Sequence, residues 1–161
     1  MKRNTLLALV AFHLTITAPA MAATDHASHS HEHGSAVASL QLNAGQKWET
    51  DAALRQSMSN IRQAMTASLH AIHENRLPAK KYDALAKKVE HEVGEIVANC
   101  KLAPEADAQL HLIVADLMTG AEQMAGKTKS VKRQRGAVGV IGALEKYSTY
   151  FEDAGFKPIT H

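Results

Sequence analysis

The chain has little of what marks a disulfide-rich or aromatic-rich protein. Among its 161 residues there is one cysteine, and aromatic residues make up 4%. A single cysteine, Cys100, excludes a disulfide within one chain. Cys100 is therefore a buried small hydrophobic residue, a crosslink between two copies or a metal ligand, and we favour burial because it continues an apolar helical pattern.

Long apolar runs are also scarce, and the one that stands out lies at the beginning. Lys2 and Arg3 precede an apolar run over residues 6–18, which Ala20-Met21-Ala22 follows. This order is typical of a cleavable signal peptide, and the run is too short to span a bilayer. We therefore expect a signal peptide at residues 1–22 and a protein exported to the periplasm, without stable membrane insertion.

An excess of charge of one sign is missing once this leader is set aside. The whole chain has a formal net charge of +2, but without Lys2 and Arg3 the remaining 16 Lys and Arg balance 16 Asp and Glu. The basic residues over 127–135 have no interleaved aromatic residues, so we expect no nucleic-acid partner. No nucleophile–base spacing, zincin motif, phosphate-binding loop or carboxylate-rich four-helix motif occurs, and we therefore expect no enzyme.

What the chain does contain is apolar residues spaced by three or four, the repeat of one helix face. Four stretches show this spacing, at about residues 50–73, 78–100, 104–124 and 131–153. Short connections favour antiparallel neighbours. The predicted fold is therefore all-α, an antiparallel up-down four-helix bundle over 47–156, preceded by the signal peptide and a disordered His-rich arm at 23–46 and followed by a tail at 157–161.

Capping residues and prolines predict where these helices begin. Thr50 or Asp51 can cap the first helix, and Pro78 and Pro104 suit the first position of the second and third. Charged residues of the second helix, among them Glu92, are expected on its solvated side.

Two residue patterns within the predicted helices have more than one interpretation. Gly136, Gly139 and Gly142 recur every third residue of the last helix. They favour close packing of a partner helix, with a flat cofactor as the alternative. Met58 and Met65 share one face of the first helix and are interpreted as core residues, with a Cu(I) site as the alternative.

Histidine is in unusual supply, with ten residues. Four of them, His26, His29, His31 and His33, lie within eight residues of the arm. Imidazoles suit copper, zinc and nickel, and a flexible segment can place several around one ion. The arm is thus predicted to bind a transition metal, and the alternative is a solubilising tail without ligands.

Three further histidines are weaker candidates for metal ligands. His70 and His73 are three residues apart near a helix end, where they either chelate a metal or interact with the helix dipole, which we favour. His111 lies in an apolar run and is expected to be half-buried with a hydrogen-bond partner. It is also expected to lie well away from Cys100.

Four stretches of the chain resemble a group of small exported bacterial proteins labelled DnrO-like. They are Leu42–Trp48, Asp51–Arg62, Val97–Leu102 and Ala143–Phe151. The resemblance implies export and a helical fold, and it implies no activity. The predicted bundle also resembles that of cytochrome b562 and cytochrome c′. However, Cys-x-x-Cys-His is missing and the last helix has no histidine before His161, so covalent haem is excluded and non-covalent haem is disfavoured.

Three classes of function follow, in the order in which we favour them. The first is a periplasmic protein that binds or buffers copper, zinc or nickel through its arm. The second is a structural or adaptor bundle that binds another envelope protein. The third is a non-covalent haem bundle that uses Met58 and His111.

Overall fold

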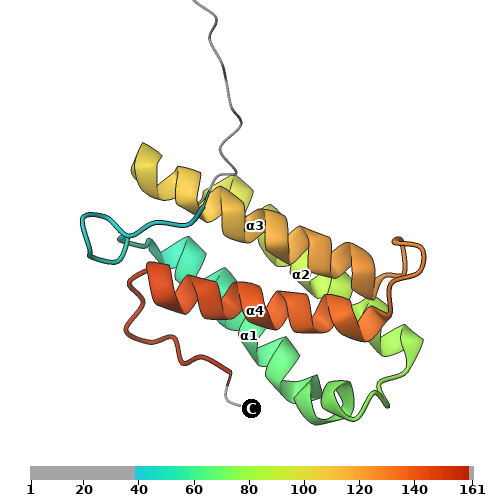
Figure 1. Cartoon of the computed structure of the whole chain (residues 1–161). Helices are drawn as coiled ribbons and strands as arrows, with labels where there is room; N and C mark the ends of the chain where they lie inside the picture. Colours follow the sequence, from blue (N-terminus) through green and yellow to red (C-terminus); the bar gives the residue numbers. More distant parts are fainter. Residues whose placement is uncertain (1–38, 160–161) are drawn as a thin grey trace, which may run out of the picture. The chain divides into compact units, whose positions relative to one another are not determined.

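A computed structural model of the chain describes residues 39–159, which form four α-helices and no strand (Figure 1). In chain order these are α1 (Ala52–His73), α2 (Ala79–Asn99), α3 (Pro104–Met124) and α4 (Arg133–Tyr150). The prediction of an all-α fold with four helices is therefore confirmed. Within these residues, no helix combines the length and the apolar character that crossing a bilayer requires.

The helices begin close to where capping residues and prolines predict. Asp51 caps α1, because its Oδ1 accepts a hydrogen bond from the amide of Leu54 at 2.8 Å. Pro104 is the first residue of α3, as predicted. Pro78 has an extended backbone with ψ 149° and is the N-cap residue of α2, so this helix begins one residue later than predicted.

The last helix is shorter than predicted at both ends. α4 ends at Tyr150, after which Phe151 is extended with φ −118° and ψ 139°. The backbone around this point pairs with Trp48 instead of continuing the helix. The amide of Trp48 donates to the carbonyl of Tyr150, and the amide of Glu152 donates to the carbonyl of Trp48, both at 2.8 Å. The segment before α1 is thereby joined to the end of α4.

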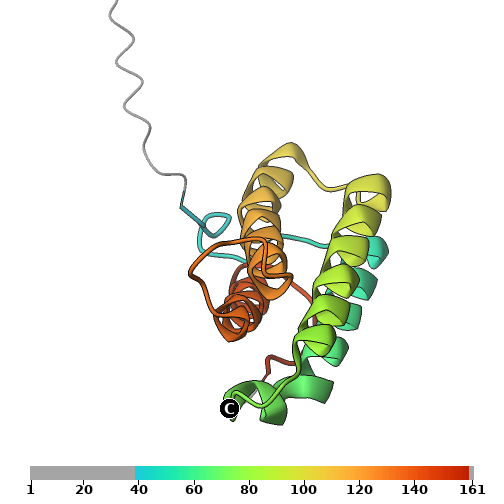
Figure 2. The same cartoon turned by 90° about the vertical axis from the view of Figure 1, so that its right-hand side faces the viewer.

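The four helices pack as two neighbouring pairs. α1 lies beside α2 and α3 lies beside α4 (Figure 2). α2 also packs against α3, and α4 contacts both α1 and α2, whereas α1 and α3 do not touch each other. The apolar sides of all four helices therefore share one core.

The core side chains are largely those that the helical spacing predicts. Met58 and Met65 have no exposed surface, which confirms that they belong to the core. The aromatic residues gather at the end of α4, where the rings of Tyr147 and Phe151 stack with centroids 5.7 Å apart and Phe156 meets Tyr147 edge-on at 5.0 Å. In all, α1 buries Leu54, Met58, Ile61, Met65 and Ile72, and α3 buries Ala106, Leu110, Ile113, Leu117 and Met124.

α3 and α4 approach each other closely at a pair of glycines. A Cβ on Gly136 would lie 2.5 Å from the carbonyl oxygen of Gly120, and a Cβ on Gly120 would lie 2.6 Å from Cγ2 of Val140. Side chains larger than hydrogen do not fit at this crossing. Close helix packing is therefore confirmed for Gly136. It is wrong for Gly142, because no atom lies within 4 Å of a Cβ built there.

The described parts of the segments flanking the helices also contribute to packing. Leu40, in the predicted arm, packs against the core. The amide of Gln41 donates to Oε1 of Gln109 on α3 at 2.8 Å, and Nε1 of Trp48 donates to the carbonyl of Gln41 at 2.6 Å. Ile159, in the predicted tail, is 6% exposed. Residues 39–46 and 157–159 therefore have defined contacts with the helices.

Candidate functional site

The predicted metal ligands divide into an arm set and a helix set. His26, His29, His31 and His33 lie outside the described residues, so their role stays a prediction. His70, His73 and His111 lie on described helices and can be placed. No group of three or more His, Cys, Asp or Glu side chains in residues 39–159 is arranged to hold a metal ion.

His70 and His73 are exposed on the last turn of α1. Nε2 of His70 lies 3.0 Å from Oε2 of Glu74, and the same carboxylate pairs with Arg76. Imidazoles in the last turn also interact favourably with the carbonyl end of the helix. The end of this helix is closed from α4, where Nε2 of Gln134 donates to the carbonyl of Ile72 at 2.7 Å. His70 therefore already has a carboxylate partner beside it.

His111 is exposed, so the prediction that it is half-buried is wrong. Its side chain is 71% exposed. The inward face of α3 is occupied by Leu110 and Ile113, and His111, which follows Leu110 by about 100° of helix rotation, points away from the core. Its Nδ1 lies 2.8 Å from the carbonyl oxygen of Asp107 and 3.4 Å from Oδ2 of the same residue.

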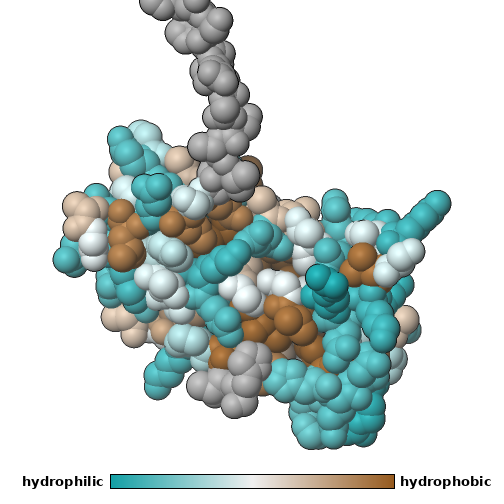
Figure 3. All heavy atoms as spheres, in the orientation of Figure 1, coloured by the Kyte–Doolittle hydropathy of each residue, from teal (hydrophilic) through white to brown (hydrophobic). Residues whose placement is uncertain are grey.

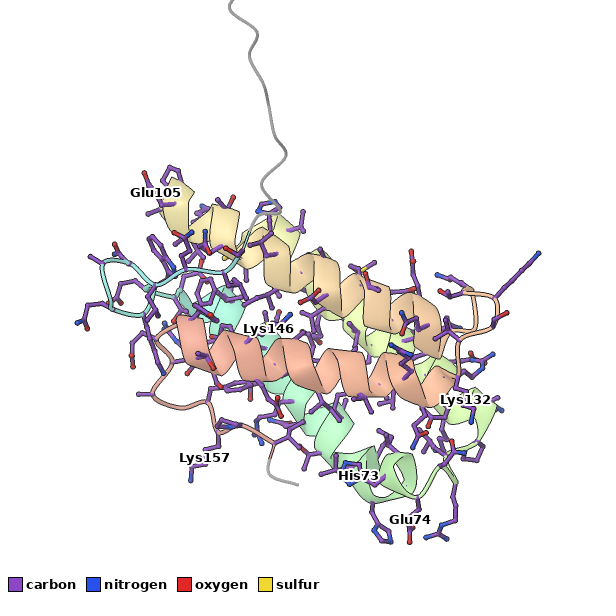
Figure 4. All side chains as sticks on the ribbon, in the orientation of Figure 1. His73, Glu74, Glu105, Lys132, Lys146 and Lys157 are labelled. Carbon is purple, nitrogen blue, oxygen red and sulfur yellow. The ribbon has the colours of Figure 1, made fainter. Side chains whose placement is uncertain are left out.

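The helix histidines do not form one site. α1 and α3 do not touch, and His70 and His73 end α1 whereas His111 lies in the second turn of α3. Figure 4 shows His73 and Glu74 at the end of α1, well separated from Glu105 at the start of α3. Any metal held at these positions would therefore be held by two donors at separate places.

The structure brings Cys100 and His111 together, contrary to the prediction that they are well apart. Both line a hollow of about 220 Å³ between the end of α2 and the start of α3, and Asp107 and Val97 line it too. Cys100 is half-buried as the C-cap residue of α2. Placing the helices antiparallel by residue count misjudged this level, because the extended residues after Asn99 carry the chain back over the turn.

A carboxylate keeps the Cys100 thiol protonated. Burial raises the pKa of Cys100 to about 12, and the nearby Asp51, which is hydrogen-bonded to the thiol, and Asp107 add to this effect. Because the thiolate is the nucleophile and the metal ligand, this thiol is unreactive at neutral pH. Cys100 thus serves packing and hydrogen bonding more readily than catalysis.

Asp51 connects three parts of the chain. Its Oδ2 accepts the amide of Lys101 at 2.6 Å, in addition to the cap on Leu54 and the bond to the Cys100 thiol. Burial acts to raise the pKa of Asp51, but these hydrogen bonds outweigh it and the pKa is lowered. Asp51 is therefore ionised at neutral pH and fixes the start of α1 against the α2–α3 turn.

Glu92 is buried, so its assignment to the solvated side of α2 is wrong. It is 3% exposed. Its carboxylate accepts from Nζ of Lys88 at 2.6 Å and from Nδ2 of Asn60 at 3.1 Å, and Ser57 is a further hydrogen-bond partner. The signal was present in the sequence, because Leu85, Val89, Glu92 and Ile96 follow the same three-and-four spacing. Burial acts to raise the pKa of Glu92, but these partners lower it overall.

A second hollow, of about 560 Å³, lies between the start of α1 and the segment after α4. Its lining mixes opposite charges, with Arg55 facing Glu49, Glu152 and Asp153. Arg55 donates through Nη1 to the carbonyl of Thr50 at 2.6 Å. Because the charges are mixed and Arg55 already has a partner, the hollow selects no particular ligand.

No family model matches the chain, and no curated protein or solved structure is significantly similar to it. The resemblance to DnrO-like proteins therefore stays a prediction from the sequence.

Proposed function

We propose that this chain is an exported periplasmic protein that binds or buffers divalent copper, zinc or nickel through its arm. Its helices would form an antiparallel up-down bundle behind a cleaved signal peptide. The observation that carries the proposal is the presence of His26, His29, His31 and His33 within eight residues. Neutral imidazoles are ligands that these three metals share, and several on one segment can meet at one ion.

The helix histidines add weaker sites to this proposal. His70 and His111 each have a carboxylate one turn away, at 3.0 Å for Glu74 and 3.4 Å for Asp107. An exposed imidazole with one carboxylate supplies two donors, which binds a divalent ion less tightly than a set of four. The chain acts in this proposal as a metal carrier and not as an enzyme.

The test is a calorimetric titration of the mature chain with Zn(II), Ni(II) and Cu(II). One variant replaces His26, His29, His31 and His33 with Asn, and the matched control replaces His70, His73 and His111 with Asn. We expect the arm variant to lose stoichiometric binding and the control to keep it. Equal affinity in the arm variant and the wild type would overturn the proposal.

A second candidate is a structural or adaptor bundle that binds another envelope protein. It is supported by Val97, which is 74% exposed on α2 beside the hollow of Cys100. Crosslinking from position 97 in envelope extracts, with Val97→Glu as the comparison, tests it. Non-covalent haem has no such support, because Met58 is fully buried and His111 is exposed, on helices that do not touch.

A further inference from the structure

α4 has an apolar face that no other part of residues 39–159 covers. Val138 on this face is 52% exposed, which is unusual for a large apolar side chain in the middle of a helix. Brown and white spheres gather over the middle of α4 in Figure 3, on the side turned to the viewer. Gly139 and Gly142 border Val138 on the same side of the helix.

Packing within one chain explains only some of the glycines of α4. Gly136 is required by the crossing with α3. At Gly139 a Cβ would meet only the Cα of Gly120, at 4.0 Å, and at Gly142 it would meet nothing within 4 Å. Glycine in a helix interior is destabilising relative to alanine. The described chain therefore contains no contact that accounts for Gly142.

The glycines form the floor of a hollow along α3 and α4. It has a volume of about 390 Å³, and its floor includes Gly120, Gly139 and Gly142. A second hollow, of about 530 Å³, adjoins it and shares Arg135 and Val138. A groove with a backbone floor lets another helix approach more closely than side chains would allow.

The charged residues around the groove are arranged by sign. Arg135 stands at the end nearer the start of α4. At the other end Asp116 of α3 is paired with Lys146 at 2.6 Å, and its side chain is 44% exposed. Rotation of the molecule by 180° about an axis through the glycines would place the basic end over the acidic end. The face is therefore complementary in charge to a copy of itself.

We propose that this groove is occupied by a second copy of the chain, with α4 antiparallel to α4 of the partner subunit. Val138 enters the hollow above the partner's Gly139 and the partner's Gly142. Arg135 pairs with Asp116 of the partner subunit. A twofold interface forms each such contact twice, which is why a single self-complementary face suffices. Metal binding by the arm has no part in this association.

The first test measures the mass of the mature chain by sedimentation velocity, from micromolar to millimolar concentration and with a chelator present. We expect a dimer whose dissociation constant rises at least about tenfold in Val138→Glu and in Gly142→Leu. Val97→Glu, an equally exposed valine on α2, is the matched control and leaves the dimer unchanged. Circular dichroism confirms that each variant is folded.

The second test probes the charge pairing directly. Arg135→Glu places like charges over Asp116, and Asp116→Arg places like charges over Arg135, so each variant alone is monomeric. A mixture of the two restores opposite charges at both contacts and recovers the dimer. A wild-type chain that is monomeric throughout, a dimer that persists in Val138→Glu, or a mixture that stays monomeric would overturn the proposal.

Discussion

Asp51 and Lys101, fifty residues apart, are joined by a hydrogen bond of 2.6 Å from the Lys101 amide to the Asp51 carboxylate. The same carboxylate caps α1 through the amide of Leu54. One side chain thus satisfies backbone donors from two parts of the chain that helix geometry alone leaves unpaired.

Replacing Asp51 with Ala should destabilise the fold. The change removes the cap on Leu54 and leaves the Lys101 amide without its acceptor, and together these losses cost about 2 kcal/mol. The free energy of unfolding from urea denaturation measures the effect. Glu49→Ala, an exposed carboxylate two residues earlier, is the control and should change the free energy by less than about 0.5 kcal/mol.

Glu92 should make stability depend on acid. Its pKa is lowered in the folded state, because the bonds from Lys88, Asn60 and Ser57 outweigh the effect of burial. A carboxyl group with a lowered folded pKa stabilises the fold at pH values above its unfolded pKa, and this contribution is lost as the pH falls through the folded pKa. We therefore expect the urea midpoint to fall in acid.

Substitution of Glu92 separates its part of this acid sensitivity from that of other groups such as Asp51. Glu92→Gln should lower the midpoint at neutral pH and reduce its further fall in acid. Glu95→Gln, on the exposed side of the same helix, should keep the wild-type pH profile. Parallel profiles for wild type and Glu92→Gln would contradict the assignment.

The crossing of α3 and α4 predicts opposite effects for two Gly→Ala substitutions. Gly136→Ala should destabilise the protein by about 1–3 kcal/mol, because the new methyl group overlaps the backbone of Gly120 and Met124. Gly94→Ala on α2 should stabilise it by about 0.5–1 kcal/mol, because nothing lies within 4 Å of the added atom. Thermal unfolding measures both, and equal signs would contradict the observed packing.

The Cys100 thiol should react slowly with disulfide reagents in the folded protein. Its raised pKa leaves little thiolate near pH 8, and Asp107 contributes to that elevation. Asp107→Asn should lower the pKa and speed the reaction, about threefold for a shift of half a unit. Asp116→Asn, on the same helix and outside the hollow of Cys100, serves as control. The pH dependence of the labelling rate provides the measurement.

Periodicity and capping chemistry suffice to predict the number of helices, most of their core residues and the roles of Asp51 and Pro104. They fail where tertiary contacts decide. Glu92 was placed by its charge and not by its position on the apolar stripe, and its partners Ser57 and Asn60 come from another helix. The end of α4 depends on backbone pairing with Trp48, a contact over about a hundred residues that no local pattern indicates.

The candidate sites were predictable to a smaller extent. Imidazoles can be counted in a sequence, but whether two of them meet depends on which helices touch. α1 and α3 do not, so His73 and His111 remain apart. The meeting of Cys100 with His111 depends on the path of the turn between α2 and α3, which spacing along a helix does not determine.

The pairing of Trp48 with the backbone at Tyr150 and Glu152 has a consequence for how the molecule is made. A ribosome delivers Trp48 about a hundred residues before its partners exist. Until then the growing polypeptide lacks the contact that closes the first helix over the last. If it is exported as we propose, it can pass through a narrow translocation channel as a loose thread and acquire its final shape on the far side.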